Sequence, residues 1–185
     1  MNYANIKPCD IANGVGVRTS LFVSGCTRHC KDCFNQEAQD FNYGLPFTED
    51  VEDMIILTLK PNYVDGLTVL GGEPFEPANQ EAVLHLLKRV RKELPSKTIW
   101  CYTGNVLERD IINPIGGAHT EYSDELLKYI DVLVDGPFIS ELKNISLRFR
   151  GSENQRLINL PETLKQNKVI LWNDGLGRKE IIEGE

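Results

Sequence analysis

The chain has 185 residues, of which 41% are hydrophobic, and it carries a formal net charge of −7. This length suits one domain with a proper hydrophobic core, and no apolar run approaches the length of a membrane span. Because nucleic-acid binding needs a basic surface, the acidic balance argues against nucleic acid as a partner.

Strands and helices are predicted to alternate along the chain. The predicted elements are strands over residues 19–24, 66–70, 98–102 and 131–135, and helices over residues 48–60, 79–94 and 123–130. Residues 148–150 and 169–172 are weaker strand candidates. Such alternation predicts parallel strands joined by right-handed crossovers. A complete eight-fold barrel needs about 200 residues or more, so we expect an α/β fold with one domain, an incomplete parallel β/α barrel.

Three cysteines follow the first predicted strand. Cys26, Cys30 and Cys33 have the spacing C-x3-C-x2-C. Three thiolates leave one iron of a four-iron cluster without a protein ligand. Catalytic metal sites keep such a position open, whereas structural sites close it. The spacing therefore predicts an iron–sulfur centre with one coordination position free for another molecule.

Other uses of these cysteines remain as alternatives. A structural zinc site usually has two paired units of cysteine or histidine, and the sequence lacks the second pair. His29 adjoins Cys30, which makes joint ligation of one ion awkward. A disulfide would suit a secreted protein, but no targeting segment opens the chain, and we expect a reducing cytoplasm. Cys101 lies in an apolar run and is predicted to be buried, whereas Cys9 has no assigned role.

A glycine-rich motif follows the second predicted strand. Gly71 and Gly72 permit close approach of a ligand to the backbone, and Glu73 could accept the ammonium group of an amino acid. An ordinary strand-to-helix turn is the alternative. In parallel architectures active sites gather at the carboxyl ends of strands, so this motif and the cysteines should share one rim. Asp135 ends a later strand and is a candidate on the same rim.

The two motifs together resemble those of the radical S-adenosylmethionine enzymes. Within that superfamily the chain resembles the family of proteins that activate anaerobic ribonucleoside-triphosphate reductases. The matching segments span roughly residues 3 to 160 and include residues 10–18, 21–26, 33–35, 44–48, 132–138 and 150–156. One departure from the wider superfamily is Asp32, which stands where many members have an aromatic residue; here the aromatic residue is Phe34.

The resemblance implies a set of site residues. Cys26, Cys30 and Cys33 would bind three irons of a [4Fe-4S] cluster, and the fourth iron would chelate S-adenosylmethionine. Gly71, Gly72 and Glu73 would hold the methionine end of S-adenosylmethionine. Phe34 would lie near the adenine, and Asp32 and Cys33 would contribute backbone contacts. Asp135 is added to the cofactor-binding candidates because of its place on the rim.

The resemblance also implies a reaction. One electron from the cluster would cleave S-adenosylmethionine to methionine and a 5′-deoxyadenosyl radical, which would take hydrogen from a glycine of the reductase large subunit. The reduction potentials of iron–sulfur clusters reach down to about −700 mV. This cleavage needs a potential near the low end of their range, which implies a flavodoxin-type reductant. Alternatives are activation of another glycyl-radical enzyme such as pyruvate formate-lyase, a small-molecule radical enzyme, and a non-enzymatic iron–sulfur or zinc-binding module. We expect the activase domain over residues 1–172 and a loosely ordered tail over residues 173–185; the segment after Leu160 has no assigned role.

Overall fold

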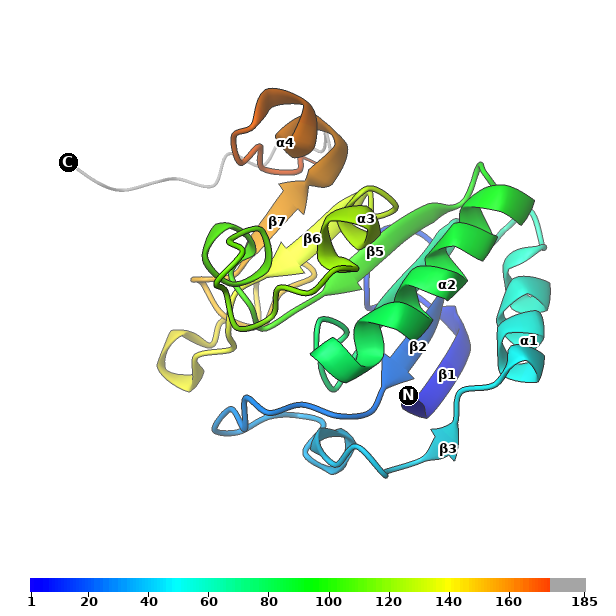
Figure 1. Cartoon of the computed structure of the whole chain (residues 1–185), viewed down its shortest axis with the longest axis horizontal. Coiled ribbons are helices and arrows are strands. Elements are labelled where there is room, and N and C mark those ends of the chain that lie inside the picture. The colour runs from blue at the N-terminus through cyan, green and yellow to red at the C-terminus, as the bar shows by residue number, and fades with distance from the viewer. Residues whose placement is uncertain (174–185) are drawn as a thin grey trace.

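A mixed sheet runs through the molecule in the strand order β3-β1-β2-β4-β5-β6-β7 (Figure 1). The computed structural model describes residues 1–173, so nearly all of the tail expected from the sequence lies outside the described residues. The strands are β1 (Asn2–Asp10), β2 (Arg18–Val23), β3 (Leu45–Pro46), β4 (Gly66–Gly71), β5 (Thr98–Tyr102), β6 (Val132–Asp135) and β7 (Arg156–Asn159). The helices are α1 (Glu49–Leu59), α2 (Pro77–Glu93), α3 (Ser123–Leu127) and α4 (Leu160–Gln166), with short helical turns at Glu37–Gln39, Leu107–Ile111 and Ser140–Leu142.

The centre of the sheet is parallel and its edges are antiparallel. β2, β4, β5 and β6 pair in parallel, which confirms the four strands and their parallel direction predicted from the sequence. β1 pairs antiparallel with β2 and β3, and β7 pairs antiparallel with β6. The expectation that every strand is parallel was therefore wrong at both edges, and the sheet is open.

The elements that the sequence did not reveal are those with little periodic apolar character. β1 is an edge-side strand with mostly exposed or half-buried residues, and β7 has only four residues. The two weaker strand candidates were wrong: residues 148–150 form no strand, and residues 169–172 contribute a single bridge between Leu171 and Ile158. Asparagine is a preferred N-cap residue, and Asn159 precedes α4 in the sequence. In the structure its side chain caps α4 by accepting a hydrogen bond from the backbone N–H of Glu162 at 3.1 Å.

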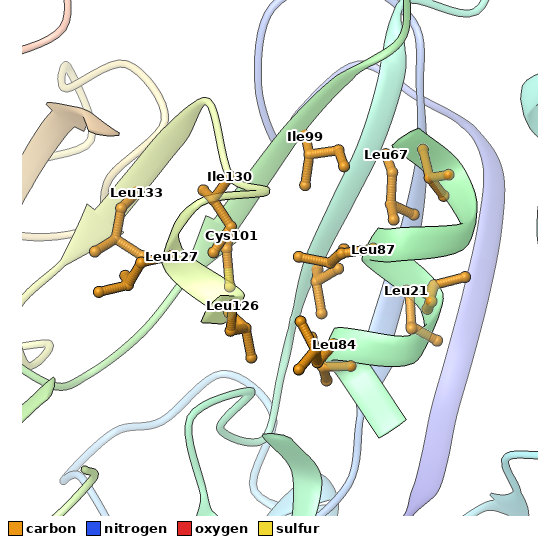
Figure 2. Close-up of a cluster of buried hydrophobic side chains, with 14 of the residues drawn as sticks. Leu21, Leu67, Leu84, Leu87, Ile99, Cys101, Leu126, Leu127, Ile130 and Leu133 are labelled. Carbon is orange, nitrogen blue, oxygen red and sulfur yellow. The ribbon is translucent and has the colours of Figure 1, made fainter. Parts of the chain in front are cut away.

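The main core lies between the sheet and helices α1, α2 and α3 (Figures 1 and 2). The strands contribute Leu21, Leu67, Ile99, Cys101 and Leu133, and α2 and α3 contribute Leu84, Leu87, Leu126 and Leu127. Cys101 is buried in this core, as predicted. The central strands carry apolar residues on both faces, as parallel strands covered on both sides do.

The opposite face of the sheet carries a second cluster. Trp100 packs edge-on against Phe149 and Trp172, with ring centroids 5.3 and 5.0 Å apart. On the same side, Arg18 is 1% exposed and its guanidinium donates hydrogen bonds to Thr68 and to backbone carbonyls, while burial lowers its pKa to about 10. Arg18 Nη1 also donates to the carbonyl of Val15, which holds the glycine-rich loop before β2 against the sheet.

Candidate functional site

A cavity of about 510 Å³ lies at the carboxyl ends of the parallel strands. Its wall combines the cysteine loop after β2, the glycine motif after β4, the end of β5 and the residue after β6. The lining from these four places is Cys26, Arg28, Cys30, Asp32, Cys33, Phe34, Gly71, Gly72, Glu73, Tyr102, Thr103, Gly104 and Gly136. The two motifs therefore meet in one cavity, as their positions after neighbouring parallel strands predict.

The cysteine loop turns sharply before its second and third cysteines. His29 and Asp32 have φ values of 45° and 58°, and each precedes a cysteine. The Asp32 carboxylate accepts a hydrogen bond from Ser140 Oγ at 2.7 Å, which ties the loop to the short helical turn at Ser140–Leu142. Phe34 follows the last cysteine, lines the cavity and is 82% exposed.

Cys26, Cys30 and Cys33 are half-buried thiols on the cavity wall. Within residues 1–173, no three side chains of histidine, cysteine, aspartate or glutamate are close enough together to hold a metal ion. Burial raises the pKa of Cys26 to about 11, and the nearby carboxylates of Glu73 and Glu76 add to this effect. Thiolates are the metal-binding form, so these cysteines must lose their protons when a metal centre binds.

Three hydrogen bonds fix the loop between the first two cysteines. The backbone N–H and the hydroxyl of Thr27 both donate to Glu76 Oε1 at 2.7 Å. Arg28 Nη1 donates to Asn105 Oδ1 at 2.9 Å. The first cysteine is thus tied to the turn before α2 and to the loop after β5.

The glycine motif packs directly against the cysteine loop. Gly71 has a φ of +113°, and a Cβ atom on Gly72 would lie 2.5 Å from the carbonyl oxygen of Gly25. The backbone N–H of Glu73 donates to that same carbonyl at 2.8 Å. Glycine is required at position 72 because any side chain there would push the two segments apart.

Glu73 lines the cavity but is only 2% exposed. Its Oε1 accepts hydrogen bonds from the backbone N–H of Phe75 at 2.9 Å and from Thr103 Oγ1 at 2.8 Å. Its Oε2 accepts from the backbone N–H of Gly104 at 2.8 Å. Burial raises the pKa of Glu73, and these donors and the Arg28 charge oppose that effect. The carboxylate therefore joins the motif to the turn after β5.

Asp135 is the one predicted site residue that the structure does not bring to the cavity wall. Its side chain is fully buried, and its carboxylate accepts hydrogen bonds from Arg156 Nε and from the backbone N–H of Leu107, both at 2.9 Å. Arg156 also pairs with Glu108. The next residue, Gly136, lines the cavity, so Asp135 supports the wall from behind.

Sequence reasoning missed the far wall of the cavity and two buried polar atoms of residues that line it. The far wall is formed by Phe138, Lys143, Asn144, Ile145, Leu147, Phe149, Arg150, Gly151 and Gln155. This segment has no regular apolar period, and its only signal was the resemblance over residues 132–138 and 150–156. The hydroxyl of Tyr102 and Nε of Arg28 are buried without a hydrogen-bond partner among the described residues. The cavity wall thus combines three thiols with the glycine motif and the far wall.

The sequence of this chain is similar to those of several known proteins. A family model described as a 4Fe-4S single cluster domain matches residues 12–158. The chain is 45% identical over 158 residues to the anaerobic ribonucleoside-triphosphate reductase-activating protein of Vibrio cholerae serotype O1, covering 84% of this chain and 96% of that protein. It is 41% identical over 157 residues to the protein of that name in Escherichia coli strain K12, covering 84% and 96%.

The protein of the same name in Enterobacteria phage T4 is 39% identical over 157 residues, covering 85% of this chain and 93% of that protein. Helices with the length and apolar character needed to cross a membrane do not occur within residues 1–173. The family model assigns an iron–sulfur cluster to the domain that contains the three cysteines. The chain belongs to the family of anaerobic ribonucleoside-triphosphate reductase-activating proteins.

Proposed function

We propose that this protein activates an anaerobic ribonucleoside-triphosphate reductase by reductive cleavage of S-adenosylmethionine. The observation that carries the proposal is the meeting of the three-cysteine loop and the glycine motif in one cavity. Family membership supports the reductase as the partner. The partner is the large subunit of the reductase, and the product is a glycyl radical stored on it.

Cys26, Cys30 and Cys33 are the proposed ligands of a [4Fe-4S] cluster. The other two cysteines do not join them on the cavity wall, because Cys101 lies in the core and Cys9 lies on β1. Three ligands for four irons leave one position for the amino and carboxylate groups of S-adenosylmethionine. The fit is supported by the donor set, since thiolates are the usual ligands of such clusters.

When bound, the cluster and S-adenosylmethionine supply one-electron cleavage to methionine and a 5′-deoxyadenosyl radical, which takes a hydrogen atom from the reductase glycine. The chain itself supplies the cavity and the placement of the groups within it. Gly71 and Gly72 let the backbone approach the methionine end, and Glu73 keeps this motif in place through its bonds to Thr103 and Gly104. The carboxylate of Glu73 already serves protein donors, so we assign the ammonium contact chiefly to backbone carbonyls.

The adenine side of the cavity is assigned to the residues around the third cysteine. Phe34 offers an exposed ring at the cavity wall, and Asp32 and Cys33 supply backbone contacts beside it. Asp135 is assigned a positioning role, because its bond to Arg156 fixes the chain just before Gly136.

We also propose that the electron comes from a flavodoxin-type reductant and that the reaction takes place in the cytoplasm. Residues 1–172 form the activase domain, and the sheet represents an incomplete barrel whose strand ends surround the cavity.

The proposal is tested by mixing the iron-loaded protein without oxygen with S-adenosylmethionine, dithionite and a candidate glycyl-radical enzyme. Electron paramagnetic resonance should show a glycyl doublet with the anaerobic reductase and none with pyruvate formate-lyase. The Cys30→Ala variant is the matched control and should give no doublet with either enzyme. A doublet with pyruvate formate-lyase alone, or with neither enzyme, would overturn the proposal.

A further inference from the structure

Arg28 lies between the first two cysteines and lines the cavity, so it brings a positive charge to the cysteine loop itself. The other charged residues of the cavity wall, within the part of the chain that the structure describes, are Asp32, Glu73, Lys143 and Arg150. Lys143 and Arg150 belong to the far wall. Among the cations of the wall, Arg28 is therefore the one that the chain keeps beside the proposed cluster ligands.

The side chain of Arg28 is held against the turn after β5. Its Nη1 donates to Asn105 Oδ1 at 2.9 Å. Its Cδ and Nε pack on Gly104, where an added Cβ atom would lie 2.6 Å from each of them. Gly104 lines the same cavity as the cysteines, so the guanidinium is fixed next to the cavity wall.

The positive charge of Arg28 has no opposite charge paired with it. Among residues 1–173 no carboxylate forms an ion pair with Arg28, whose hydrogen-bond acceptor is the neutral amide of Asn105. Asp110 lines a smaller cavity together with Arg28, but it pairs with Arg109. The charge nevertheless acts on the wall of the main cavity: burial raises the pKa of Glu73, and the Arg28 charge opposes this effect.

The hydrogen bond to Asn105 does not by itself call for an arginine. A glutamine side chain also carries an NH₂ donor and has no charge, whereas arginine stays charged in proteins. Partial burial of a cation without a partner charge is unfavourable. A negatively charged group bound in the cavity would supply the missing opposite charge.

An iron–sulfur cluster with three cysteine ligands is such a group. Three thiolates and an oxidised four-iron core together carry a charge of about −1, and one added electron makes it about −2. Net charge is one of the factors that set the reduction potential of a cluster. A cation beside the cluster therefore favours the reduced state more than the oxidised state.

We propose that the positive charge of Arg28 stabilises the [4Fe-4S] cluster, most strongly in its reduced state, and so raises its reduction potential. In the reduction the cluster takes up one electron from the reductant, and no bond is made or broken. The inference rests on the proposed function, because it takes Cys26, Cys30 and Cys33 to hold this cluster. It adds a residue that acts on the cluster through its charge.

The test compares the wild type with Arg28→Gln and Arg28→Lys, each loaded with iron and sulfide without oxygen. Dithionite is added in the presence of redox mediators, and the electron paramagnetic resonance signal of the reduced cluster is followed against the potential. At a fixed potential, the ratio of reduced to oxidised cluster should be about three- to ten-fold lower in Arg28→Gln than in the wild type. Arg28→Lys keeps the charge and should stay within about two-fold of the wild type. Lys60→Gln is the matched control, because it removes the same charge at an exposed position outside the cavity wall and should leave the ratio unchanged.

Iron analysis of the same samples completes the test. An unchanged ratio in Arg28→Gln would overturn the inference, and so would an equal decrease in Arg28→Gln and Arg28→Lys, which would show that shape rather than charge matters. Loss of iron uptake in Arg28→Gln with uptake retained in Arg28→Lys would support the inference, and loss in both variants would overturn it.

The same measurements separate the inference from the proposed function. If the loaded wild type holds no four-iron cluster, the proposed function fails together with the inference. If the wild type holds the cluster and its signal responds to S-adenosylmethionine, but the potential is the same in all variants, the inference alone fails.

Discussion

Thr103 Oγ1 donates a hydrogen bond to Glu73 Oε1 at 2.8 Å, and this bond joins the turn after β5 to the glycine motif after β4. Thr103 Oγ1 in turn accepts from the backbone N–H and the side-chain amide of Asn105 at 3.0 and 3.1 Å. Asn105 accepts from Arg28, which lies between the first two cysteines. One chain of hydrogen bonds therefore connects the segments proposed to hold the cluster and those proposed to hold S-adenosylmethionine.

Replacing Glu73 by glutamine should weaken this connection. Glutamine keeps the shape of the glutamate side chain but has only one acceptor oxygen. Its NH₂ group would face hydrogen-bond donors that now bond the carboxylate, which are the hydroxyl of Thr103 and the backbone N–H groups of Phe75 and Gly104. We expect the free energy of unfolding to fall by about 1–3 kcal/mol, the usual cost of leaving buried donors unpaired. Urea unfolding measures this, with Glu121→Gln on an exposed position as the control. Equal stability of Glu73→Gln and wild type would contradict the assigned role.

The same variant should change the pH dependence of stability. Folding raises the pKa of Glu73 above its ordinary value of 4.5, mainly through burial, so the folded state holds this proton more tightly than the unfolded state. Its stabilising contribution is present below the unfolded pKa and is lost as the pH rises through the folded pKa. The difference in unfolding free energy, wild type minus Glu73→Gln, should therefore decrease as the pH rises from 4.5. A constant difference across that range would contradict the shift.

Substitution of Gly72 by alanine should separate the two motifs. The new methyl group would lie 2.5 Å from the carbonyl oxygen of Gly25 and 2.7 Å from that of Ala38, and both are backbone atoms that cannot rotate away. Forced contacts of this kind cost about 1–3 kcal/mol of stability. Gly117→Ala is the matched control, because a methyl group there meets nothing within 4 Å. Thermal unfolding should show a lower midpoint for Gly72→Ala alone, and equal midpoints would refute the close approach.

Replacement of Asp135 by alanine should act mainly on stability. The change leaves Arg156 with Glu108 alone and leaves the backbone N–H of Leu107 without its acceptor. Breaking one side of a buried ion pair costs about 3 kcal/mol, and urea unfolding would detect it. The affinity of the loaded variant for S-adenosylmethionine should stay within about two-fold of the wild type, since it retains every cavity-lining side chain. Unchanged stability with lost affinity would instead place Asp135 in direct contact with the cofactor.

The sequence was most informative where local chemistry decides the structure. The four central strands and helices α1 and α2 follow from apolar periods bounded by proline and glycine, and the cysteines and Gly72 follow from their spacing after neighbouring strands. The roles of Glu73 and Asp135 depend on partners 30 and 21 residues away along the chain, respectively, which no local pattern reveals. The unpaired hydroxyl of Tyr102 is likewise visible only after the sheet has formed.

The central claim is that three cysteines hold a four-iron cluster whose remaining iron is open to S-adenosylmethionine. The most direct measurement is electron paramagnetic resonance of the reduced, iron-loaded protein as S-adenosylmethionine is added, together with metal analysis. The account predicts four irons per chain and a cluster signal that changes on addition, with both lost in Cys26→Ala, Cys30→Ala and Cys33→Ala. Zinc in place of iron, or a four-iron signal that S-adenosylmethionine leaves unchanged, would contradict it.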